Sequence, residues 1–172
     1  MAADGPLLIC YDGSENAKDA IRSAGRLLAK THALVLTVWE PAASPGGFAW
    51  LGDGTTIVNF AELDRAAAEH GGRVAGEGVH IALEEGLHAE PITIKAAGPV
   101  WKTILDIADN EDAAAIVMGC RGLTGVRSLL LGSVSSAVVH HAERPTLVVH
   151  RPSEPGIRTH DRALETSGSR GE

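Results

Sequence analysis

The chain has 172 residues, of which 44% are hydrophobic and only 3% aromatic, and its formal net charge is −7 at pH 7. This length and composition predict one compact domain with a core of aliphatic side chains. The acidic balance argues against nucleic acid or an anionic membrane surface as the main partner. No stretch has the length of a membrane span or the pattern of a signal peptide, so we expect a cytoplasmic protein.

The apolar pattern predicts strands that alternate with helices. Residues 6–11 form an uninterrupted apolar run typical of a buried parallel strand, and Ser14 then caps a helix that ends near Ala29. By the same criteria we predict strands at residues 33–39, 88–95, 113–118 and 145–150, and helices at residues 57–85, 98–110 and 133–143. Glycines weaken the longest of these helices and leave a kink or a break open at Gly71, Gly72, Gly76 and Gly78.

This alternation is typical of an α/β domain with a five-stranded parallel sheet and right-handed crossovers. We expect a doubly wound sheet with helices on both faces and the strand order 3-2-1-4-5. Pro91 suits an edge position for the third strand, which agrees with that order. The domain is expected to span residues 1–150, and the Ser, Gly, Arg and Glu of residues 151–172 predict a disordered tail.

A glycine-rich stretch, residues 118–134, joins the fourth strand to its helix. Glycine lets the backbone turn its N–H groups towards an anion, and a helix N-terminus adds unpaired donors and a positive dipole end. Ser133 is placed to cap the helix or to bind a phosphate oxygen. Glycine-rich turns also occur in proteins that bind nothing, and neither a Walker A nor a Gly-x-Gly-x-x-Gly pattern is present. Glycine chemistry alone therefore leaves anion binding and a plain connection equally open.

Three further features accompany this stretch. Asp12 follows the first strand at the edge where open α/β sheets bind ligands, although an Asp-Gly-Ser turn also uses its aspartate as a cap. Arg121 and Arg127 are placed to neutralise a phosphate, or are simply solvated. The segment of residues 40–56 leaves the second strand at the same edge, so it is either a lid, with Trp50 over a ligand, or a loop that packs locally.

The spacing Gly-x2-Gly-x9-Gly-Ser, formed by Gly119, Gly122, Gly132 and Ser133, resembles the motif of the ATP-binding branch of the universal stress protein family. The similarity extends from about Leu7 to His150. It implies that backbone N–H groups around the three glycines, with the Ser133 hydroxyl, hold a triphosphate. It also implies that Asp12 contacts the ribose or a Mg²⁺-bound water, that the Val38 backbone holds the adenine, and that the same site includes Met118, Arg121 and Val134. Relatives pair through the fifth strand, which implies a homodimer through Thr146 to Val149.

The leading hypothesis is thus an ATP-binding regulatory protein of the stress response, and two alternatives stay open. The first is a slow ATP hydrolase; the glycine stretch has no lysine and no evident base, so at most a weak activity is expected. The second is a partner-binding module with an empty pocket, because fold alone does not give function. The sequence does not rank ATP against ADP, AMP or a cyclic nucleotide.

Overall fold

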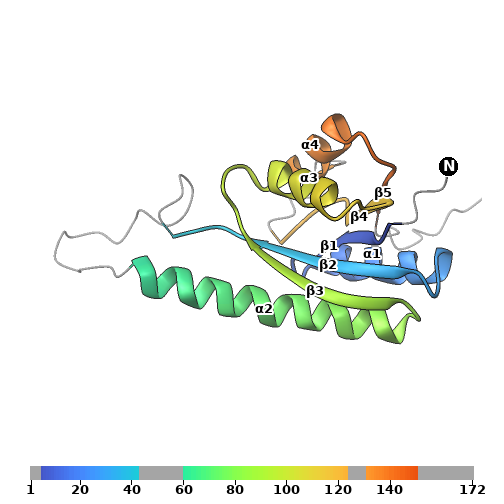
Figure 1. Cartoon of the computed structure of the whole chain (residues 1–172), viewed down its shortest axis with the longest axis horizontal. Coiled ribbons are helices and arrows are strands. Elements are labelled where there is room, and N and C mark those ends of the chain that lie inside the picture. The colour runs from blue at the N-terminus through green and yellow to red at the C-terminus, as the bar shows by residue number, and fades with distance from the viewer. Residues whose placement is uncertain (1–4, 43–59, 124–130, 151–172) are drawn as a thin grey trace, which may run out of the picture.

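The computed structural model describes residues 5–42, 60–123 and 131–150. Gly125, Arg127, the predicted lid beyond Ala42 and the predicted tail lie outside the described residues. Strands and helices alternate in the order β1 (Leu7–Cys10), α1 (Glu15–Leu27), β2 (His32–Trp39), α2 (Phe60–Glu84), β3 (His88–Lys95), α3 (Val100–Asn110), β4 (Ala115–Gly119), α4 (Ser133–His141) and β5 (Thr146–Val149) (Figure 1).

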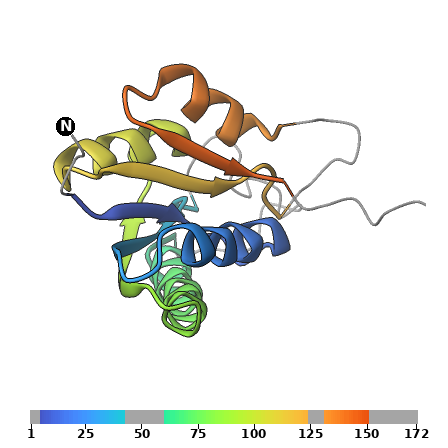
Figure 2. The same ribbon diagram turned by 90° about the vertical axis from the view of Figure 1, so that its right-hand side faces the viewer.

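The strands form one parallel sheet in the order β3-β2-β1-β4-β5, which confirms the predicted fold class. Helices α1 and α2 lie on one face of this sheet, and α3 and α4 lie on the other (Figure 2). No helix in the described residues is both long enough and apolar enough to span a membrane.

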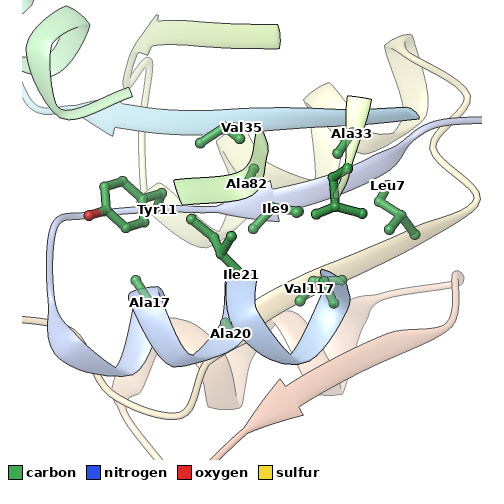
Figure 3. Close-up of a cluster of buried hydrophobic side chains, with 12 residues drawn as sticks. Leu7, Ile9, Tyr11, Ala17, Ala20, Ile21, Ala33, Val35, Ala82 and Val117 are labelled. Carbon is green, nitrogen blue, oxygen red and sulfur yellow. The ribbon is translucent and has the colours of Figure 1, made fainter. Parts of the chain in front are cut away.

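A hydrophobic layer fills the space on each side of the sheet. Side chains alternate along a strand, so Ile9 of β1 points to the α1 and α2 side and Leu8 points to the α3 and α4 side. On the first side Ile21 of α1 packs on the sheet, within the cluster that Figure 3 shows. On the second side Ile104 of α3 and Val138 of α4 are buried. This double coverage explains why the central strands have almost uninterrupted apolar sequences.

Helix α2 is a single 25-residue helix, so the glycines do not break it. Two of them face the sheet at close range. A Cβ at Gly78 would lie 2.8 Å from the Tyr11 ring and from the Val35 side chain, and one at Gly71 would lie 3.1 Å from Thr93. The glycines therefore let the helix lie close to β1, β2 and β3. Helix propensity alone, on which the expectation of a break rested, carries no information about this packing.

The sheet reverses its winding direction between β1 and β4. The chain passes from β1 to β2 and β3 through α1 and α2, and then returns through α3 to β4 on the other side of β1 (Figure 1). In open α/β sheets such a reversal leaves a crevice beyond the carboxyl ends of the two strands. The ends of β1 and β4, and the loops that follow them, are therefore where the fold makes room for a ligand.

Candidate functional site

A pocket of about 460 Å³ opens in this crevice. All nine residues that the sequence predicted for ligand binding line it. They are Asp12, Val38, Met118, Gly119, Arg121, Gly122, Gly132, Ser133 and Val134. The ends of β1, β2 and β4 and the start of α4 thus meet at one hollow, and no side chain of the described residues fills it.

One wall of the pocket is an apolar slot. Aliphatic side chains from four elements line it: Leu36 and Val38 of β2, Met118 of β4, Val134 of α4, and Val100 and Ile104 of α3. The sequence predicted α3 and its inward face, but not that this face reaches the ligand edge. That depends on how α3 packs across β2, which no local pattern encodes.

Hydrogen bonds hold the two ends of the glycine stretch together. The Gly132 N–H donates to the Cys120 carbonyl at 2.7 Å, and the Ser135 hydroxyl donates to the same carbonyl at 2.9 Å. The Gly132 N–H is therefore satisfied within the protein. Its carbonyl begins α4, with the Ser136 N–H at 2.9 Å. Gly132 thus serves to bring the loop back to the end of β4.

The first turn of α4 presents its backbone donors to the pocket. Gly132 is the N-cap, so Ser133 does not act as the cap, and no side chain in the described part of the chain caps the helix. The N–H groups of Ser133, Val134 and Ser135 belong to the first turn and have no partner inside the helix. These N–H groups and the positive end of the helix dipole lie at the pocket wall, an arrangement that favours an anion.

Gly119 and Gly122 have different neighbours. A Cβ at Gly119 would lie 2.7 Å from the backbone of Asn16, so this glycine lets α1 approach β4. A Cβ at Gly122 would lie 2.6 Å from the Asp12 carboxylate oxygen Oδ2. Gly122 therefore makes room for the Asp12 carboxylate beside the glycine stretch.

Asp12 uses its two carboxylate oxygens differently. Oδ1 accepts a hydrogen bond from the Ser14 N–H at 3.0 Å and so holds the turn, in which Gly13 has a φ of +82°. Oδ2 lies on the side of Gly122, within the pocket lining. The structural and the ligand-facing interpretations of this aspartate are thus compatible.

The end of β2 leaves a backbone edge open at Val38. On one side of β2, the last hydrogen bond is the one that the Tyr11 N–H, just after the end of β1, donates to the Leu36 carbonyl. On the other side, the pairing with β3 continues further, and the Ala96 N–H donates to the Trp39 carbonyl. Backbone groups alternate from side to side along a strand. The N–H and C=O of Val38 therefore point away from β3, and no strand in the described part of the chain pairs with them there.

The charged groups in the described lining are the carboxylates of Asp12 and Glu40 and the guanidinium of Arg121.

Burial, reinforced by the charge of Asp12, raises the pKa of the Cys10 thiol to about 12. This cysteine is therefore a neutral thiol at physiological pH and part of the apolar floor, as its place in a core strand predicts.

A parallel sheet with this order, and a ligand-sized pocket at its point of reversal, define the doubly wound α/β class with its site in the expected place. The chain belongs to the universal stress protein family, whose family model matches residues 5–150. A universal stress protein from Thermus aquaticus, named for its position in the 3′ region of the QAH/OAS sulfhydrylase, is 34% identical over 146 residues, which cover 83% of this chain and 96% of the relative.

Solved structures of the family have the same fold. The protein MJ0577 of Methanocaldococcus jannaschii is similar with a TM-score of 0.70 and 24% identity, over 88% of this chain and 99% of that one. A universal stress protein from Archaeoglobus fulgidus, solved in complex with dAMP, has a TM-score of 0.56 and 24% identity, over 84% and 96%. Other family members with similar folds were solved with cAMP and with AMP.

Proposed function

We propose that this protein binds an adenine nucleotide, in the first place ATP, in the pocket between β1 and β4 and acts as a nucleotide-dependent regulator. One observation carries the proposal: an open strand edge at Val38 and an uncapped helix start at α4 face the same hollow. The dAMP, cAMP and AMP complexes of family members with this fold support an adenine nucleotide as the ligand. The glycine spacing supports a polyphosphate.

The open edge of β2 suits the adenine base. The Val38 N–H can donate to the ring nitrogen N1, and the Val38 carbonyl can accept from the 6-amino group. The apolar slot between β2 and α3 then covers the faces of the base, whose burial is favourable. In this arrangement, the backbone provides the hydrogen bonds and the aliphatic side chains provide the contact area.

The start of α4 suits the phosphates. Three first-turn N–H groups, the Ser133 hydroxyl and the Arg121 guanidinium offer donors and positive charge. The Asp12 carboxylate opposes a bare polyphosphate at Gly122, and it is the hard oxygen donor that Mg²⁺ prefers. Asp12 therefore fits a Mg²⁺ ion that accompanies a triphosphate, which would supply positive charge, and it fits a ribose hydroxyl equally well.

We favour a switch over an efficient hydrolase. Beside a metal ion, fast phosphoryl transfer needs a group that positions water and a cationic partner. The described lining offers the carboxylates of Asp12 and Glu40 and the guanidinium of Arg121 for these roles, and it contains no lysine or histidine. Bound nucleotide would instead favour one conformation of the surrounding loops and so change what the protein presents to a partner.

The test is calorimetric titration with ATP and Mg²⁺, using two variants with the same substitution. In Gly122→Ala the new methyl group meets the Asp12 carboxylate and displaces it, so we expect binding at least about tenfold weaker than in wild type. Gly76→Ala in α2 is the control, because a Cβ there has no neighbour within 4 Å among the described residues, and its affinity should equal that of wild type. Absence of binding by wild type, or equal binding by both variants, would contradict the proposal.

A further inference from the structure

The pocket contains a second carboxylate, Glu40, which neither the glycine motif nor the phosphate site uses. It follows β2 by one residue and lies two residues after Val38, and both residues line the pocket. Asp12, the other carboxylate, lies against Gly122 in the glycine stretch. Glu40 is thus on the β2 side, where the open Val38 edge is, and it makes no ion pair with any residue that the structure describes.

The chain around Glu40 is held in place by α2 and β3. The Ala42 N–H donates to Asp64 Oδ1 at 2.9 Å, and Asp64 Oδ2 lies 2.6 Å from the Lys95 ammonium. The same ammonium lies 5.3 Å from the centre of the Trp39 ring. The Lys95 hydrogen bond, followed by that of the Ala42 N–H, lowers the pKa of Asp64, so this carboxylate is charged at neutral pH. These contacts hold the chain on both sides of Glu40, which itself lines the pocket.

The Val38 backbone alone selects poorly between purines. Its N–H and C=O can pair with N1 and the 6-amino group of adenine. After a small shift of the base, they can also pair with the 6-oxo group and the N1–H of hypoxanthine or guanine. The neighbouring side chains of the slot are apolar and read neither pattern. Discrimination at the 6-position therefore needs another polar group nearby.

We infer that Glu40 is a specificity-determining residue, which selects 6-amino purines over 6-oxo purines. This inference rests on the proposed function. An ionised carboxylate only accepts hydrogen bonds, so it takes the second hydrogen of a 6-amino group and opposes the oxygen of a 6-oxo group. When a site places a hydrogen-bond acceptor opposite a substrate N–H, an analogue that has an acceptor in place of that N–H binds more weakly. The two acceptors then face each other without a hydrogen bond. Since Glu40 is exposed to solvent, the discrimination is about tenfold rather than several thousandfold.

The experiment compares AMP with IMP, which share the ribose and one phosphate and differ at the purine 6-position. We expect wild type to bind AMP at least about tenfold more tightly than IMP. Glu40→Gln should bring the ratio close to one, because its amide N–H can donate to the 6-oxo group. Glu40→Ala should lower the ratio mainly by weakening AMP. Glu111→Gln, an exposed carboxylate at the end of α3, is the matched control and should keep the wild-type ratio.

The outcomes separate this inference from the proposed function. If Glu40→Gln and Glu40→Ala both bind AMP and keep the wild-type ratio of AMP to IMP, the role of Glu40 is wrong and nucleotide binding stands. If wild type prefers IMP, the inference is also wrong. If wild type binds neither nucleotide, the proposed function fails and takes the inference with it. Thermal unfolding of each variant establishes that it is folded during the titration.

Discussion

At the scale of single residues, the glycines of this protein have two different structural roles. Some of them allow two elements to lie close together: Gly119 lets α1 approach β4, and Gly78 lets α2 approach the Tyr11 ring. Gly122 instead leaves space for a carboxylate beside the pocket, while a Cβ at Gly72 or Gly76 would have no described residue within 4 Å. The consequences of replacing a glycine therefore follow from what its missing Cβ would touch.

This distinction predicts opposite effects for the same substitution within one helix. Gly78→Ala places a methyl group 2.8 Å from the Tyr11 and Val35 side chains, so we expect the free energy of unfolding to fall by about 1–3 kcal/mol. In Gly76→Ala the new methyl group has no described residue within 4 Å, and alanine is a better helix former than glycine. We therefore expect the free energy of unfolding to rise by up to about 1 kcal/mol. Urea unfolding measures both. A loss of similar size in the two variants would mean that the packing of α2 on the sheet is not as described.

Residue-level prediction from the sequence succeeded in grouping and was incomplete in assigning roles. The motif spacing brought Gly119, Gly122, Gly132 and Ser133 to one pocket. It did not predict that the Gly132 N–H donates to the Cys120 carbonyl, nor that Gly132 rather than Ser133 is the N-cap of α4. Such assignments depend on contacts between the two ends of a loop, which spacing alone does not specify. Glu40 had a usable signal, because it is the first residue after a strand at the ligand edge.

At the scale of elements, β5 is an edge strand, and β4 is the only strand beside it among the described residues. The carbonyls of Pro145 and Val149 accept from β4, so the odd-numbered residues direct their backbone groups inward. Thr146 and Val148 therefore direct theirs to the free edge. An apolar edge of this kind is a template for a second strand, and we propose that two copies of the chain pair there.

The alternation gives a selective test of that dimer. Val148→Pro removes an outward N–H and leaves the bonds to β4, so we expect a folded monomer in sedimentation velocity, where wild type is a dimer. Val148→Ala loses similar side-chain packing but keeps the N–H, and it should remain a dimer. A dimeric proline variant with an unchanged dissociation constant would place the interface elsewhere.

The bounds of β1, β2 and β4 were predictable to within a few residues because these central strands are covered on both faces and appear as nearly continuous apolar runs. Helix α2 was predicted at residues 57–85 with a kink or a break left open, and it is observed from Phe60 to Glu84 without a break. Its glycines weaken an isolated helix, but their contacts with Tyr11 and Thr93 are tertiary. Sequence propensity cannot anticipate a stabilisation that exists only once the helix lies on the sheet.

At the scale of the whole molecule, topology determines where the site is. The strand order places the reversal of winding between β1 and β4, and the pocket lies at that point. The order was expected from the doubly wound class and from Pro91 at an edge position, and the ligand edge was expected from the same class. The apolar slot was not, since Val100 and Ile104 reach the pocket only through the packing of α3 across β2. The protein as a whole is acidic, and the described lining of the pocket carries the carboxylates of Asp12 and Glu40 beside the guanidinium of Arg121. The proposed phosphate site therefore depends on the first-turn N–H groups of α4, on Arg121 and on a Mg²⁺ ion held by Asp12.

The most direct measurement is nuclear magnetic resonance of the ¹⁵N-labelled protein during titration with AMP and with ATP and Mg²⁺. The account predicts the largest amide shifts at Val38, Gly122 and Val134, saturating together with one dissociation constant, while Gly72 and Gly76 on the outer face of α2 stay unchanged. Saturating nucleotide without shifts at Val38 and Val134, or with the largest shifts on a different face of the molecule, would contradict nucleotide binding at this site.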